Sequence, residues 1–196
     1  MVDIRPRQRW LVPVLLLAMV ATLVGAVLVR NLYTEPEPQT PPAVLPTKTS
    51  VPPSQQPGPA TVVGTQDALS HPLYETVRVL LQAFFESINA KDYDLWRTTV
   101  TSQRVQDTTK QDWLDDFRST QDGSPVVYRI ELGEKGAARV LLTFTSTQDI
   151  ESAPPELPVG CINWSVVYPL EFEDGQWRIG TGATSATPQL DECPPR

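Results

Sequence analysis

The chain has 196 residues, a formal net charge of −7, two cysteines, one histidine and twenty prolines. The charge is divided unevenly, because residues 1–30 carry four arginines and one acid, which leaves −10 for residues 31–196. An acidic bulk argues against binding nucleic acid or anionic lipid through overall charge, and so few cysteines and histidines argue against a metal site. The length fits one modest domain with accessory segments.

An uncharged apolar segment covers residues 10–29, directly after Arg5, Arg7 and Arg9. A helix of that length spans about 30 Å, which is the thickness of the hydrocarbon core of a bilayer. Arginines before the segment and acids after it predict a cytoplasmic head (residues 1–9) and an exported remainder. We therefore expect a single-pass protein of the cell membrane with its N-terminus in the cytoplasm and its C-terminal part extracytoplasmic.

Two other interpretations compete with an uncleaved anchor. A cleaved signal peptide has a shorter apolar region and a cleavage site of small residues, whereas this run is long and ends in Val27-Leu28-Val29-Arg30. A buried core helix would need packing neighbours that a short head and a proline-rich segment do not supply. No cysteine follows the run, which excludes a lipoprotein anchor.

Residues 30–66 are rich in proline, with nine prolines between Glu35 and Ala60. Such a segment forms neither helix nor sheet and is expected to be extended, partly as polyproline II. The plain interpretation is a spacer that lifts a domain off the bilayer. The alternative is a docking site for a proline-binding module, since Pro38-Gln39-Thr40-Pro41 matches Pro-x-x-Pro.

From residue 67 to 196 the pattern becomes that of a folded domain, beginning with a strongly amphipathic helix. Ser70 or His71 is its expected N-cap, with Pro72 in the first turn and Asn89 as the C-cap. The apolar stripe is Leu73, Val77, Leu80, Leu81, Phe84, Phe85 and Ile88.

Two further helices are expected before the strands. Asp92 is the predicted cap of a second helix, which carries Tyr93, Trp96 and Val100. Thr108-x-x-Gln111 resembles a capping box for a third helix. The third helix has an inward face of Trp113, Leu114 and Phe117 and an opposite face of Asp112, Asp115, Asp116 and Ser119. The opposite face is either a solvated surface or a cation site.

After Gly123 the apolar period changes to two, which predicts four antiparallel strands. Pro169 predicts a sheet edge or a bulge, and Asp174-Gly175 predicts a tight hairpin. The expected inward residues are Val126, Tyr128, Ile130, Leu132, Val140, Leu142, Phe144, Ile162, Trp164, Val166, Tyr168, Leu170, Phe172, Trp177 and Ile179. The predicted class is α+β, with three helices packed on a curved antiparallel sheet of about four strands.

The pattern Phe84-Phe85-x-x-Ile88-x-x-x-Asp92-Tyr93-x-x-Trp96 resembles the opening of the nuclear transport factor 2-like (cystatin-like cone) superfamily. The segment Glu173-Asp174-Gly175-Gln176-Trp177-Arg178-Ile179 is similar to the last hairpin of that superfamily. The resemblance implies a cone-shaped fold, which hosts enzymes, pocket binders and interaction modules. The layout also resembles actinobacterial single-span proteins that carry such a domain outside the membrane, including those associated with mammalian-cell-entry lipid transporters.

Cys161 and Cys193 both lie in the part expected outside the cytoplasm, where an even pair predicts a disulfide. The alternative is a catalytic or metal-binding thiol, which no histidine or third cysteine supports.

The predicted inward faces carry no Asp, Glu or His, and the only histidine, His71, is expected to be a cap. We therefore expect no catalytic, cofactor-binding or metal-binding residue and no cofactor.

Three hypotheses for the function follow from the sequence. The first is a non-enzymatic interaction module that binds another envelope protein or complex, through a polar outward face of Thr143, Thr145, Asn163, Ser165 and Arg178. The second is a carrier or sensor of a small apolar ligand, in a pocket lined by Trp96, Tyr128, Phe144 and Trp164. The third and weakest is an enzyme.

Overall fold

The computed structural model describes residues 52–181 and 187–194. The expected head, the apolar segment 10–29 and the first part of the proline-rich stalk lie outside these residues. Within the described residues, no helix has both the length and the apolar character needed to cross a bilayer. Residues 49–196 form a unit of their own by their internal contacts.

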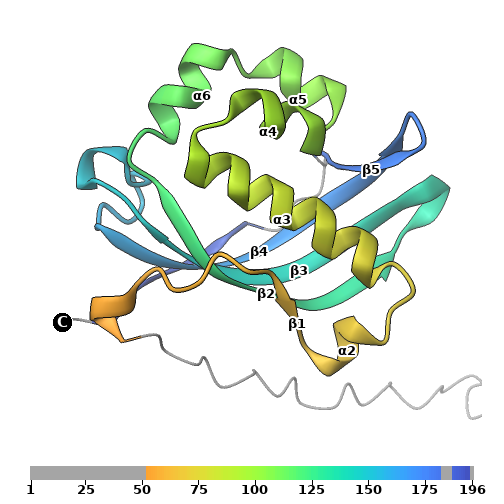
Figure 1. Ribbon diagram of the computed structural model, residues 1–196, viewed down its shortest axis with the longest axis horizontal. Coiled ribbons are helices and arrows are strands. Elements are labelled where there is room, and N and C mark those ends of the chain that lie inside the picture. Colours follow the sequence, from red (N-terminus) through yellow and green to blue (C-terminus); the bar gives the residue numbers. More distant parts are fainter. Residues whose placement is uncertain (1–51, 182–186, 195–196) are drawn as a thin grey trace, which may run out of the picture. The chain divides into compact units, whose positions relative to one another are not determined.

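The described residues form five α-helices and a mixed sheet of six strands (Figure 1). The helices are α2 (Gln66–Leu69), α3 (Tyr74–Ala90), α4 (Tyr93–Thr99), α5 (Ser102–Asp107) and α6 (Lys110–Asp116). The strands are β1 (Val63–Gly64), β2 (Gln121–Leu132), β3 (Ala137–Thr147), β4 (Cys161–Glu173), β5 (Gln176–Ile179) and β6 (Gln189–Glu192). Short 3₁₀ helices occur at η1 (Pro53–Gln55), η2 (Glu134–Gly136) and η3 (Ile150–Ser152).

The sheet order is β1-β2-β3-β4-β5, and β6 also pairs with β4. The predicted antiparallel strands are β2 to β5, so the α+β class is confirmed. The sheet differs from the expectation in two added strands, because β1 pairs parallel to β2 and β6 pairs antiparallel to β4. Both are short segments of two and four residues whose pairing comes from tertiary contact rather than from an alternating pattern.

The helix caps agree with the sequence in part. The Asp92 carboxylate accepts from the Leu95 backbone N–H at 2.9 Å and begins α4, as predicted. The expected third helix is preceded by a separate short one, α5, and its cap is Thr109, whose Oγ1 accepts from the Asp112 N–H at 3.2 Å. The capping position is therefore one residue later than predicted.

Both ends of α3 differ from the prediction. The helix begins after Leu73, and His71 Nδ1 accepts a hydrogen bond from the Leu73 N–H at 3.1 Å in the turn before it. At the other end the C-cap is Lys91, with φ 59°, rather than Asn89. The Asn89 side chain instead binds the backbone N–H and C=O of Asp122 on β2. The cap prediction failed because this polar side chain has a tertiary partner.

Strand β2 contains bulges between Gly123 and Val126 and between Val127 and Arg129. Val127 is buried in place of the predicted Val126, whereas Ile130 is buried as predicted. Leu132, expected inward, is 66% exposed. A bulge adds a residue to one strand, and a strict two-residue period does not anticipate the change of face that follows. Leu132 lies on the same face as Ile130, opposite Ala138, and is exposed because it is the last residue of the strand.

The main core lies between α3 and the sheet, and the predicted α3 stripe largely forms it. Val77, Leu81 and Phe85 are fully buried on the helix side. Val140 and Leu142 of β3 meet them, and the rings of Phe85 and Phe144 lie 5.1 Å apart. In Figure 1, α3 crosses one face of the sheet, while α4, α5 and α6 lie beyond it on the same side.

The sequence pattern predicts that the stalk ends at residue 66, but the folded part begins earlier. Val62 is only 2% exposed, and its N–H donates to Gln82 Oε1 of α3 at 2.9 Å. Ser124 donates to the carbonyl of Pro57, and a Cβ at Gly123 would lie 2.5 Å from the carbonyl oxygen of Gly58. Residues 57–65 therefore lie along β2 (Figure 1), although their proline content is that of a linker.

The outer edge of β4 is covered in two separate stretches. Strand β5 pairs with Leu170–Glu173, and β6 pairs with Ile162–Ser165. Asp174 and Gly175 both have positive φ in the β4–β5 turn, which confirms the hairpin. The predicted disulfide is also confirmed, because Cys161 and Cys193 are bonded and hold β6 to β4. Residues 166–169 lie in the gap between the two stretches.

Candidate functional site

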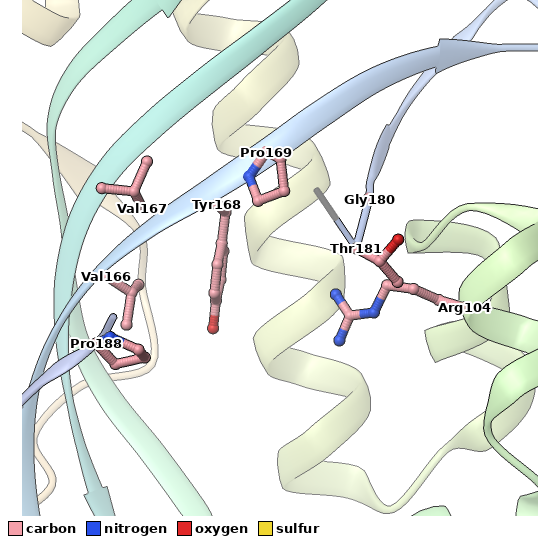
Figure 2. A pocket seen from close by; sticks show the side chains of 8 residues that line it. All are labelled: Arg104, Val166, Val167, Tyr168, Pro169, Gly180, Thr181 and Pro188. Carbon is pink, nitrogen blue, oxygen red and sulfur yellow. The ribbon is translucent and has the colours of Figure 1, made fainter. Parts of the chain in front are cut away.

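A pocket of about 300 Å³ lies at this gap in the sheet edge. Its lining comes from α5, from β4 and from the residues that follow β5 and precede β6 (Figure 2). The lining residues are Arg104, Val166, Val167, Tyr168, Pro169, Gly180, Thr181 and Pro188. The volume is at the lower end of the range that small-molecule sites occupy in proteins.

The position of the pocket follows from the local pairing. Pro169 lacks an N–H and so cannot donate to a further strand, while its carbonyl accepts from the Gly180 N–H at 2.9 Å. The predicted edge position of Pro169 is thus confirmed. Because β5 ends at Ile179 and β6 starts at Gln189, residues 166–169 of β4 have no paired strand on their outer edge, where Arg104 of α5, Gly180, Thr181 and Pro188 line the pocket.

Arg104 supplies the positive charge of the pocket. It is half-buried, and its guanidinium carbon lies 5.9 Å from the ring centre of Trp96, in cation–π range. Burial lowers the pKa of Arg104, and the nearby Tyr168 opposes that shift. No carboxylate among the described residues lies within 4.0 Å of this guanidinium. Arg78, Arg97, Arg129 and Arg139 each have such a partner.

Tyr168 supplies the polar group opposite Arg104. Its ring meets the Phe84 ring edge-on at 5.7 Å, which anchors it between β4 and α3. Burial raises the pKa of Tyr168, the charge of Asp122 adds to that rise, and Arg104 opposes it. The hydroxyl therefore stays protonated and can donate a hydrogen bond. In Figure 2 the Arg104 guanidinium points toward the space beside the Tyr168 ring.

The four residues that the sequence suggested for a pocket lie elsewhere. Trp96 is buried in a cluster with Tyr93 and Trp113, and it reaches the site only through Arg104. Phe144 and Trp164 are inward as predicted and stack on each other at 5.8 Å. Tyr128 is the extra residue of a bulge, and its hydroxyl accepts from Thr143 Oγ1 at 3.5 Å.

One buried ionisable group was not anticipated by the pattern of inward residues. Asp122 is 4% exposed, receives a hydrogen bond from Ser146, and lies near the charge of Lys91. Burial raises its pKa to about 6, against the opposing effects of Ser146 and Lys91. Asp122 is not among the residues that line the pocket. Its position before Gly123, where no alternation has begun, carried no sequence signal of burial.

Asp122 belongs to a polar junction between the end of α3 and the start of β2. Lys91 Nζ donates to the carbonyls of Ile88 and Thr120, and Asn89 binds the Asp122 backbone from the same helix end. The junction joins two elements that follow each other only after some thirty residues of intervening helices. We assign it a structural role, because its hydrogen bonds are made within the protein.

The remaining candidates of the sequence can be placed as well. Asp112, Asp115 and Asp116 are exposed on α6, and no set of three or more acidic, histidine or cysteine side chains in the described residues is arranged to hold a metal ion. On the sheet face predicted to be outward, Thr145 Oγ1 donates to Asn163 Oδ1 at 2.8 Å, and Thr145 is buried rather than exposed. Arg104 was missed because a single arginine in a short polar helix resembles any solvated residue.

The comparisons with known proteins add no family to this picture. No family model matches the chain, and no curated protein matches it.

Proposed function

We propose that the chain is a membrane-tethered, extracytoplasmic binding module, and that its pocket between α5 and β4 carries or senses a small ligand with a substantial apolar part. The observation that carries this proposal is the pocket itself, which lies where the outer edge of β4 has no paired strand. Val166, Pro169 and Pro188 give it apolar walls, and Arg104, Tyr168 and Thr181 give it a few polar groups. That combination is typical of small-molecule sites.

Binding fits these residues better than catalysis. The lining contains no carboxylate, histidine or thiol that could act as a general base or nucleophile. Asp122 has the raised pKa of a general acid, but it is enclosed by its own hydrogen-bond partners and does not line the pocket. The tether at residues 10–29 would keep the module at the membrane surface, within reach of ligands that leave or enter the bilayer.

The test is to extract the full-length protein from membranes and to identify co-purifying small molecules by mass spectrometry. Thr181 is exposed at the rim, so Thr181→Trp is expected to cover the pocket without disturbing the core. Thr98→Trp, on the exposed side of α4, is the matched control. We expect a ligand bound to the wild type and to the control but absent from the rim variant. A wild type without any bound molecule, whose melting temperature no short aliphatic compound raises, would contradict the proposal.

A second candidate function is docking onto another envelope protein. It is favoured by Leu132 and Phe172, which are 66% and 57% exposed. Both lie at the ends of strands that run in the same direction, since β2 and β4 each pair antiparallel with β3. Crosslinking in intact cells, followed by pulldown and mass spectrometry of the full-length protein, tests it. A stoichiometric envelope partner that is lost on Phe172→Ser would support docking, and capture unaffected by that change would not.

A further inference from the structure

Within the described residues Arg104 has no carboxylate partner, unlike Arg78, Arg97, Arg129 and Arg139. A half-buried guanidinium has lost part of its hydration, and its fall in pKa reflects that loss. The Trp96 ring compensates in part through a cation–π contact at 5.9 Å. The other N–H donors of the Arg104 guanidinium point into the pocket (Figure 2), where a bound anion would accept their hydrogen bonds and neutralise the charge.

Tyr168 provides a second donor directed at the same space. No described residue accepts or donates a hydrogen bond at its hydroxyl, and the edge-on contact with Phe84 holds the ring in place. A protonated phenol beside a guanidinium is a suitable pair for one oxyanion, because each group offers an N–H or O–H donor and the guanidinium adds a positive charge.

The rest of the lining is unsuited to a small inorganic anion. In Figure 2 Val166 and Pro188 lie on the other side of Tyr168 from Arg104, and their side chains offer only aliphatic contact. The volume of about 300 Å³ exceeds the needs of a lone phosphate, since a water molecule occupies roughly 30 Å³. The geometry calls for a ligand that is anionic at one end and aliphatic at the other.

We propose that the pocket binds a small anionic amphiphile, with its carboxylate or phosphate held by Arg104 and Tyr168 and its aliphatic chain against Val166 and Pro188. This inference rests on the proposed function, whose ligand class it names. The shared chemistry is an oxyanion on an aliphatic chain, which a free fatty acid or a phosphorylated lipid fragment can each supply.

Three photoreactive probes of equal chain length test the proposal on the full-length protein in membranes. They are a diazirine derivative of decanoate, of decyl phosphate and of decanol, and the crosslinked peptides are mapped by mass spectrometry. Labelling of the expected membrane segment, residues 10–29, reports how much of each probe has entered the bilayer. We expect residues 166–169 and Pro188 to be labelled at least tenfold more by an anionic probe than by decanol, relative to that internal standard.

Four variants distinguish the loss of the Arg104 charge or the Tyr168 hydroxyl from a loss of folding. Arg104→Gln is expected to weaken labelling by the anionic probes about tenfold or more, while labelling by decanol is unchanged. Arg104→Lys should restore part of it, and Tyr168→Phe should reduce it about three- to tenfold, because only the hydroxyl is removed. Arg97→Gln, which removes an exposed arginine of α4, is the control and should have no effect. Circular dichroism of each variant reports whether it folds.

The outcomes distinguish failure of the anion-binding inference from failure of the proposed function. Preference for decanoate over decyl phosphate assigns the headgroup as a carboxylate, and the reverse assigns a phosphate. Equal labelling of the pocket by decanol and by both anions would overturn this inference and leave the ligand-binding function standing. Failure of all three probes to label the pocket, with residues 10–29 labelled, would overturn the function and the inference together.

Discussion

Asp122, the buried acid at the junction of α3 and β2, makes the free energy of unfolding depend on pH. Because burial raises the pKa of Asp122 to about 6, from about 4 in an unfolded chain, the folded state holds this proton more tightly than the unfolded state. The stabilisation is complete below pH 4 and is lost as the pH rises through about 6. Over that window, Asp122 alone accounts for a loss of about 2 to 3 kcal/mol in the free energy of unfolding.

Asp122→Asn is expected to remove this dependence. The amide cannot ionise, and its oxygen can still accept the hydrogen bond from Ser146. The variant should therefore be more stable than the wild type at pH 7.5 by about 1 to 2 kcal/mol and less different at pH 4.5. Urea unfolding at a series of pH values measures it. The exposed Asp94→Asn serves as the control, and an unchanged pH profile in Asp122→Asn would rule out the assignment.

At the scale of single elements, α4 tests how much a cap contributes. The Asp92 carboxylate satisfies the Leu95 N–H, whereas Asp94, two residues later in the first turn, is exposed and makes only surface ion pairs. Asp92→Ala should lower the free energy of unfolding by about 1 kcal/mol, and Asp94→Ala by less than about 0.5 kcal/mol. Chemical denaturation of the two variants measures the difference, which would vanish if α4 were held by packing alone.

Strand β6 depends on its disulfide. It has four residues, of which Leu190 is half-buried and the other three are exposed, so burial contributes little to its pairing with β4. Reduction should lower the free energy of unfolding by about 3 kcal/mol and release β6, which would free Pro188 from the pocket wall. Hydrogen exchange of residues 189–192 before and after reduction measures the release. Maleimide should find no thiol in the unreduced protein, and two reactive thiols would contradict the bridge.

At the scale of the whole molecule, the start of the folded unit can be located by truncation. A fragment of residues 49–196 retains β1 and Val62 and is expected to melt within a few degrees of the full chain. A fragment of residues 67–196 loses the burial of Val62 and the pairing of β1, which should lower the free energy of unfolding by about 2 to 4 kcal/mol. Calorimetry of the two fragments tests it, and equal stability would place the boundary at residue 67.

Local patterns predicted most of the fold. The α3 stripe, the Asp92 cap, the β4–β5 hairpin and the disulfide partners all depend on spacing or on residue chemistry within short windows. The failures lie where a distant partner changes a local rule. Asn89 binds β2 instead of capping α3, the bulges of β2 bury Val127 in place of Val126, and β1 arises in a proline-rich segment because β2 offers it an edge.

The sequence by itself determined the α+β class, the order of the main elements and the disulfide, because these follow from periodicity and from the number of cysteines. The predicted anchor at residues 10–29 likewise depends only on a run of apolar residues. Only the tertiary structure decided the site. Arg104, Tyr168 and Pro188 line one pocket because the outer edge of β4 is unpaired between the stretches that β5 and β6 cover. That gap depends on how far each short strand extends, which is a balance of long-range contacts that no local pattern records.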